Sequence, residues 1–268
     1  MSSISQWCGR FGNNIQQISN AIFYCKENEF DFISPDNSLI NSFNIKFGDI
    51  YCPSKLYFFH IPSQIGNGIP DYIVGDIDKL RSDRRVICRD IIYNFLKIDF
   101  NKIVDLGEDV IVLHIRSGDI FSRKNYYCPV VSNYLQNPLS YYINIIKGYR
   151  EVIVVTEDYE NPVISVLEKY ENVEVRILSE SQSIELILSS RNIVTSGVSS
   201  FGIACVLLSR NIKRLYCSNL YLDEVLNYKN FIDGDVEVIV SNIDQDRYIE
   251  WDEWLNTDEQ RKLMIDYI

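Results

Sequence analysis

Residues 112–121, V-L-H-I-R-S-G-D-I-F, constrain the fold of this chain more than any other segment. An apolar run at 110–113 is followed at once by His114, Arg116 and Asp119. This pattern predicts a buried strand whose carboxyl end carries a histidine, an arginine and a carboxylate. Open α/β sheets bind ligands at that end of their strands, and an arginine there suits a phosphate or diphosphate. The alternative is that Arg116 and Asp119 only form an ion pair that closes the strand.

A second unusual element lies near the amino terminus. Residues 9–14, G-R-F-G-N-N, precede a segment in which Ile15, Ile18 and Ile22 recur at helical spacing. The two glycines predict a tight turn with exposed backbone. A glycine-rich turn that opens a helix offers free N–H groups and a favourable dipole to an anion. The alternative is an ordinary turn with an asparagine cap.

Strands and helices alternate regularly after residue 110. The predicted strands are 110–116, 151–156, 173–178, 193–195 and 213–217, and the predicted helices are 138–149, 162–170, 183–190 and 201–209. Such alternation indicates βαβ units and a parallel sheet. We therefore expect a Rossmann-like α/β domain over about residues 106 to 220.

The first hundred residues are less regular. They hold predicted helices at 14–25 and 83–96, an aromatic strand at 56–60, turns at 66–70 and a linker at 100–108. We interpret the chain as a smaller α/β domain at 1–105, a Rossmann-like domain at 106–240 and a tail at 241–268. The tail combines tryptophans with many acidic residues, which predicts an amphipathic helix that packs back on the first domain. A partner-binding helix is the alternative.

Composition excludes several classes of partner. The chain has 268 residues and a net charge of −11, which argues against nucleic acid and anionic membrane surfaces because both require basic patches. No segment reaches the roughly 18 consecutive apolar residues of a membrane helix, and no signal peptide is visible. The seven scattered cysteines fit reduced thiols better than a disulfide scaffold or a zinc site. We therefore expect a cytoplasmic protein.

A third motif, T-S-G-V-S-S-F at 195–201, completes an ordered set with the segments at 9–14 and 114–119. Together the three resemble the GDP-fucose-dependent fucosyltransferase superfamily, which includes α1,2-, α1,6- and protein O-fucosyltransferases. The resemblance implies a GT-B fold, in which two Rossmann-like domains face each other across a cleft. It implies acceptor binding by residues 1–105 and nucleotide-sugar binding by residues 106–240. The expected reaction is inverting transfer of fucose from GDP-fucose to a glycan hydroxyl, most simply in α1,2 linkage and without a metal or other cofactor.

The resemblance also implies roles for the residues after the central strand. Arg116 would stabilise the negative charge that develops on the diphosphate leaving group. His114 would contact the nucleotide or the sugar, or else be a buried structural histidine. Asp119 would orient Arg116, hold the loop, or act as the catalytic base that an inverting mechanism usually needs. The sequence does not identify that base; Asp49 and Glu27 are guesses.

Three further groups of residues are candidate nucleotide-sugar ligands. Glu157 and Asp158 end the next strand, where a carboxylate can accept from the N1–H and N2–H donors of guanine or can instead cap a helix. Residues Ser199, Ser200 and Phe201 open a helix and can bind phosphate or ribose, although Ser199 can also be a plain N-cap. By resemblance, the contacts of the first motif come from Gly9, Arg10, Gly12 and Asn13.

Metal motifs are weak. The D-x-D pair Asp76 and Asp78 lacks further ligands, and residues 244–246 lack the spacing of a calcium loop. The expected partners are a GDP-sugar donor and an oligosaccharide or glycoconjugate acceptor. Two alternatives remain: the same fold using another nucleotide sugar, or a non-catalytic protein that binds nucleotide sugars or glycans.

Overall fold

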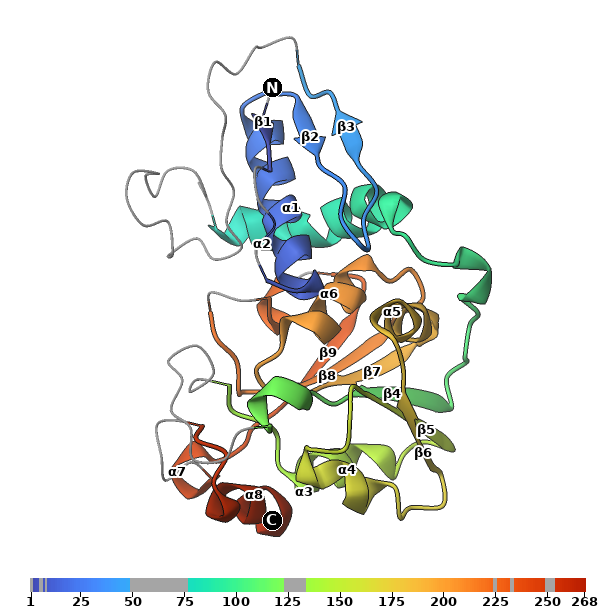
Figure 1. The fold of residues 1–268 in the computed structure, drawn as a ribbon, viewed down its shortest axis with the longest axis vertical. Helices are drawn as coiled ribbons and strands as arrows, with labels where there is room; N and C mark the ends of the chain where they lie inside the picture. The colour runs from blue at the N-terminus through green and yellow to red at the C-terminus, as the bar shows by residue number, and fades with distance from the viewer. Residues whose placement is uncertain are drawn as a thin grey trace.

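The computed structural model describes residues 2–4, 7, 9–48, 77–122, 134–223, 226–231, 234–248 and 254–268. Its main sheet has six parallel strands in the order β6-β5-β4-β7-β8-β9 (Figure 1). The strands are β4 (Val110–His114), β5 (Glu151–Thr156), β6 (Val173–Ile177), β7 (Asn192–Thr195), β8 (Arg214–Ser218) and β9 (Glu237–Ser241). This strand order is that of a Rossmann-like α/β fold, and the direction of winding reverses between β4 and β7.

Helices cover both faces of this sheet (Figure 1). One face carries α5 (Glu180–Ser189) and α6 (Ser200–Leu208), and the other carries α3 (Leu139–Ile146), α4 (Pro162–Leu167) and α8 (Asp258–Asp266). Alternation along β4 explains the two layers, because side chains of successive strand residues point to opposite faces. Val110 and Val112 pack with α5 and α6, whereas Ile111 and Leu113 pack with α3 and α4.

Local sequence signals set where these helices begin. Ser179 and Gln182 form a capping box at the start of α5. Asn161 caps α4, and Pro162 occupies the first helical position, where its missing N–H costs nothing. Thr257 caps α8 with the same type of capping box. Each of these caps determines the residue at which its helix begins.

The amino-terminal part holds a smaller sheet and two long helices. Its strands are β1 (Ser2–Ser3), β2 (Phe32–Ser34) and β3 (Phe43–Ile45), with β1 parallel and β3 antiparallel to β2. Helix α1 (Phe11–Glu27) lies across α6, and α2 (Ile77–Val86) continues into a π-helical turn at Ile87–Ile91 and a 3-10 turn at Ile92–Phe95. Both helices share one hydrophobic core with the α5–α6 face of the main sheet.

Most predicted elements after residue 110 match the structure within one to three residues; the larger differences concern the amino-terminal helices and β9. Helix α1 begins at Phe11 rather than at residue 14, and the second helix begins at Ile77 rather than at residue 83. Strand β9 was not predicted. The helix predicted at 138–149 ends at Ile146, three residues earlier than predicted. The strand predicted at 56–60 and the turns at 66–70 lie outside the described residues. Shorter 3-10 turns lie at Phe100–Lys102, Gly118–Ile120 and Tyr228–Phe231.

The position predicted for the tail helix is wrong. After α7 (Gln245–Tyr248), the tail runs to α8, which packs against α3 and α4 of the main sheet. The Trp254 indole N–H donates to the Ile120 carbonyl oxygen at 3.0 Å, and Met264 is buried in the same core. An amphipathic pattern reveals that a helix buries one face but does not reveal which surface receives it. The open apolar surface of α3 and α4 receives this one.

Candidate functional site

A cavity of about 540 Å³ opens at the carboxyl ends of β4 and β5, beside the point where the strand order reverses. Every predicted site residue except Asp158 lines this cavity. The structure therefore brings together three segments that are separated by up to about 190 positions in the chain. This is also where a Rossmann-like sheet binds its ligands.

Glycines allow α1 to approach the cavity. Gly9 has a φ of +69°, a left-handed conformation that glycine adopts without steric cost. Gly12 packs directly on the start of α6, because a Cβ there would lie 2.7 Å from the Ser200 carbonyl carbon and 2.9 Å from the Phe201 nitrogen. The Ser200 hydroxyl donates to Asn13 Oδ1 at 3.2 Å across the same crossing. The first and third motifs are thus in direct contact.

The amino-terminal ends of three helices meet at the cavity. Gly12 and Asn13 contribute the first turn of α1, Glu180 and Ser183 that of α5, and residues 199–201 that of α6. The helices have 17, 10 and 9 residues, so each carries a dipole of about half a positive charge at this end. The Ser199 hydroxyl makes no capping hydrogen bond to α6, so its alternative role as a plain cap is not seen.

Arg116 enters the cavity from the loop after β4. Its Nη2 donates to both carboxylate oxygens of Asp119, at 3.0 and 3.3 Å, and its side chain is 18% exposed. Its Nε is buried and has no hydrogen-bond partner among the described residues. Asp119 is therefore placed to orient Arg116, the first of the roles considered for it.

His114 ends β4 on the same side as Arg116. Its ring centre lies 5.0 Å from that of Phe201, and its Nδ1 is buried without a hydrogen-bond partner. Burial, and secondarily the charge of Arg116, lowers the pKa of His114 to about 3. The imidazole is therefore neutral at physiological pH and offers the cavity a neutral ring, not a cation.

The two carboxylates after β5 have different surroundings. Glu157 lines the cavity and accepts a hydrogen bond from Arg10 Nη1 at 3.2 Å, an ion pair that is largely exposed. Gly118, at a φ of +61°, makes room for this carboxylate, because a Cβ there would lie 2.5 Å from Glu157 Cδ. Asp158 does not line the cavity. It lies beneath the loop after β4 and accepts from the Ser117 hydroxyl and from the Gly118 N–H at 3.3 Å.

Asp158 therefore supports the loop and is not placed to read a base. Burial acts to raise the pKa of Asp158, but the hydrogen bonds from Ser117 and from the N–H groups of Glu160 and Gly118 outweigh it and hold that pKa below its ordinary value. The carboxylate thus stays ionised and keeps accepting these bonds at neutral pH.

Sequence reasoning missed Glu180, Tyr134 and Ser183, all of which line the cavity. Glu180 follows the helix cap Ser179. Such a cap indicates where a helix starts, but it does not indicate which way the Glu180 side chain faces. Burial raises the pKa of Glu180, while the charge of Arg10 opposes this shift. Tyr134 belongs to no motif; its ring faces the Arg116 guanidinium with 4.8 Å between the ring centre and Cζ. Glu27, the guessed base, does not line the cavity, and Asp49 lies outside the described residues.

The charges around the cavity are nearly balanced. Its described lining has two guanidinium groups, from Arg10 and Arg116, and three carboxylates, from Asp119, Glu157 and Glu180. The helix ends add roughly half a positive charge each. The cavity is therefore a local region of positive to neutral potential in a chain with a net charge of −11.

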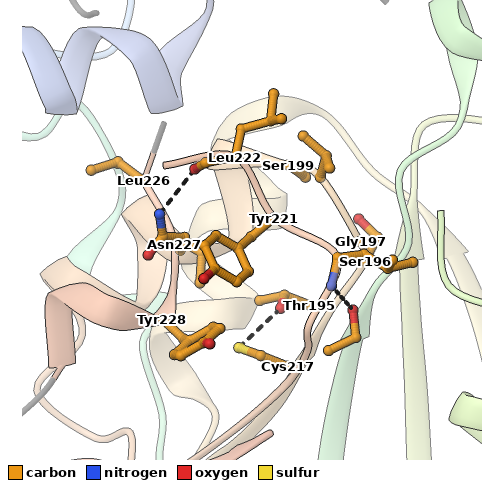
Figure 2. A pocket seen from close by; sticks show the side chains of 14 residues that line it. Thr195, Ser196, Gly197, Ser199, Cys217, Tyr221, Leu222, Leu226, Asn227 and Tyr228 are labelled. Carbon is orange, nitrogen blue, oxygen red and sulfur yellow. Dashed lines mark hydrogen bonds between the residues drawn. The ribbon is translucent and has the colours of Figure 1, made fainter. Parts of the chain in front are cut away.

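A second, much smaller cavity of about 20 Å³ lies beside the first, at the ends of β7 and β8 (Figure 2). Ser199 lines both cavities. Ser196 is 1% exposed, and its hydroxyl oxygen has no hydrogen-bond partner. The volume is enough for about one water molecule.

Among the described residues, no group of three or more His, Cys, Asp or Glu side chains is placed to hold a metal ion. Asp78 of the D-x-D pair forms an ion pair with Arg81 at 3.5 Å. None of the described helices combines the length and the apolar character needed to cross a membrane.

No protein-family model matches this chain, and searches of curated proteins and of solved structures find no significant similarity to it.

Proposed function

We propose that this chain is an inverting glycosyltransferase that transfers fucose from GDP-fucose to a glycan hydroxyl, most simply in α1,2 linkage. The observation that carries the proposal is the convergence of three distant motifs on one cavity of about 540 Å³. The motif order resembles that of the GDP-fucose-dependent fucosyltransferases. Under this proposal the α1 part and the main sheet correspond to the two facing domains of a GT-B enzyme.

Electrostatics support a diphosphate as the bound group. The amino-terminal ends of three helices and the guanidiniums of Arg116 and Arg10 surround one space. Free N–H groups at helix starts bind phosphate, and a guanidinium matches its oxygens. The diphosphate would lie between Arg116 and the start of α6, at the reversal of strand order.

Arg116 would act on the leaving group. In the proposed step the acceptor oxygen bonds to the anomeric carbon and its proton passes to a carboxylate of the cavity, for which Asp119 is the candidate. The bond from that carbon to the β-phosphate oxygen breaks, and its electron pair stays on the diphosphate. A guanidinium already held toward that oxygen stabilises the developing charge more than the ground state. A neutral His114 beside it would contribute hydrogen bonding without adding charge.

The carboxylates on the β5 side would recognise the base. Glu157 and Glu180 lie toward β5 and β6, the side on which Rossmann-like folds bind the nucleoside. Guanine offers adjacent N1–H and N2–H donors that carboxylates can accept. The position of Asp158 beneath the loop leaves Glu157, with Glu180, for this role.

The first experiment is a thermal-shift comparison of GDP, UDP, ADP and CMP, followed by GDP-fucose turnover. We expect GDP alone to stabilise the protein. Arg116→Ala should abolish this effect and lower turnover by at least about 100-fold, the usual cost of losing one transition-state donor. Arg191→Ala is the matched control. Arg191 also forms an ion pair, with Asp105, but it directly precedes β7 and so lies at the amino ends of the strands, away from the cavity.

Two results would contradict parts of the proposal. A preference for UDP or CMP would keep a nucleotide-sugar site but discard GDP-fucose as the donor. If no nucleotide stabilised the wild-type protein, while Arg191→Ala and wild type unfolded normally, the cavity would not be a nucleotide site.

A further inference from the structure

Among the described residues, only Asp119 accepts hydrogen bonds from the Arg116 guanidinium, and it accepts them from one nitrogen. Its Nη2 donates to Asp119, whose carboxylate is 45% exposed, and its buried Nε has no partner. A contact through a single nitrogen does not by itself fix the plane of the guanidinium. Another group must fix that plane if the free edge is to face a ligand consistently.

Tyr134 supplies this second contact. Its ring centre lies 4.8 Å from Arg116 Cζ, within the range of a cation–π interaction, and Tyr134 lines the same cavity. The ring packs against the central carbon of the guanidinium, whereas the Asp119 carboxylate accepts hydrogen bonds from one of its nitrogens. Together the two contacts define the position and the plane of the group.

The backbone that carries Tyr134 is firmly anchored. The Val198 N–H donates to the Leu135 carbonyl oxygen at 2.9 Å, and the Tyr248 hydroxyl donates to the Gln136 carbonyl oxygen at 2.8 Å. The Asn137 side chain donates to the Thr195 carbonyl oxygen at 3.1 Å. Residues 135–137, directly after Tyr134, are therefore bonded to β7 and the loop after it, which carry the third motif.

We propose that Tyr134 is a positioning residue that fixes the plane of the Arg116 guanidinium, so that the edge of the group that lines the cavity keeps one orientation. In the enzyme this would align Arg116 with the leaving diphosphate oxygen. That catalytic consequence rests on the proposed glycosyltransferase function; the fixing of the guanidinium does not.

The decisive comparison uses Tyr134→Leu and Tyr134→Phe. Phenylalanine keeps the aromatic face and should retain wild-type behaviour, whereas leucine removes it. The Arg116 Nε–H signal in a ¹H–¹⁵N spectrum of the ligand-free protein, assigned by its loss in Arg116→Ala, reports the order of the side chain. We expect this signal to be broadened or shifted in Tyr134→Leu and unchanged in Tyr134→Phe. An unchanged signal in a folded Tyr134→Leu protein would overturn the inference.

Turnover of GDP-fucose provides the second measurement. Tyr134→Leu should lower kcat about tenfold, the scale of a lost cation–π contact, and Tyr134→Phe should restore it. In an Arg116→Ala background Tyr134→Leu should cause no further loss, because its effect passes through Arg116. An equal loss in that background would mean that the ring acts on the ligand directly, and the inference would be wrong.

Failure of the two proposals is distinguishable. If wild type neither binds GDP nor uses GDP-fucose, the proposed function fails, but the Nε–H spectra still decide the role of Tyr134. If wild type is active and Tyr134→Leu keeps both its kcat and its spectrum, only the role of Tyr134 is wrong.

Discussion

At the scale of single residues, burial shifts two titratable groups of the cavity toward their neutral forms. It lowers the pKa of His114 to about 3 and raises the pKa of Glu180. Burial penalises whichever form is charged, so a base and an acid move in opposite directions on the pH scale. The two arginines of the cavity, Arg10 and Arg116, each face a carboxylate of the protein.

The first prediction concerns His114 and acid stability. Its folded-state pKa of about 3 lies below the unfolded value of about 6.5, so the unfolded chain takes up a proton that the folded chain does not. The contribution of neutral His114 to the free energy of unfolding is therefore complete above about pH 6.5, and it is lost as the pH falls toward 3. The free energy of unfolding of wild type should fall more steeply over this range than that of His114→Gln.

Urea titrations at several pH values measure these slopes. NMR gives an independent check, because the chain has only one other histidine, His60, and a His60→Gln variant leaves a single ring to observe. Parallel slopes, or a His114 ring that titrates near pH 6.5, would contradict the prediction.

At the scale of elements, α6 is held at both ends by the amino-terminal helices. Gly12 of α1 contacts its first turn. At the other end, the buried Arg85 of α2 donates to the carbonyl oxygens of Val206 at 2.6 Å and Leu207 at 2.9 Å. Carbonyl groups at the end of a helix lack partners within it, and a cation there is favourable. The position of α6, and with it the third motif, therefore depends on residues more than a hundred positions earlier.

The second prediction tests the crossing of α1 and α6. Gly12→Ala should destabilise the protein by about 1–3 kcal/mol, since its Cβ would press on the backbone of Ser200 and Phe201. GDP affinity should fall as well, because the start of α6 must move. Gly148→Ala is the control, as its Cβ would meet only the Ile145 carbonyl oxygen at 3.7 Å. Thermal unfolding and calorimetric titration measure both effects; equal behaviour of the two variants would refute the tight crossing.

The sequence predicts elements well where one local pattern decides the structure. Apolar β-branched runs define β4 and β5, and the glycine turn marks the start of α1 within three residues. Glu180 and Tyr134 were missed because their relevance arises only when distant segments meet. The role of Asp158 stayed open for a similar reason: a carboxylate after a strand can face the cavity or the loop beneath it, and only the fold decides.

At the scale of the whole molecule, the tail supports the loop that carries Arg116. Trp254 donates to the Ile120 carbonyl oxygen, and Arg261 Nη2 donates to the Phe121 carbonyl oxygen at 2.6 Å. The Asn256 side chain donates to the same oxygen at 2.9 Å. The turn that follows Arg116 and Asp119 is thus held by residues at 254–261.

The third prediction separates this support from general stability. Trp254→Ala removes a side chain that is 4% exposed and should cost about 3–5 kcal/mol. It should also weaken GDP binding, because the loop after β4 loses its contact with the tail. Met264→Ala removes buried packing from the same tail, at 1% exposure, but leaves the hydrogen bonds from the tail to the loop in place. It should lower the melting temperature but leave GDP affinity nearly unchanged; equal losses of affinity in both variants would contradict a specific role for Trp254.

The dependence of the loop on the tail has a consequence for synthesis on the ribosome. The partners Ile120 and Trp254 are separated by 134 positions, so the strands of the main sheet are all made before the second partner leaves the exit tunnel. While residue 254 is still inside the tunnel, the strands that have emerged can pair, yet the turn beside Arg116 lacks its anchors. Binding competence should therefore appear late in translation, after the sheet itself has formed.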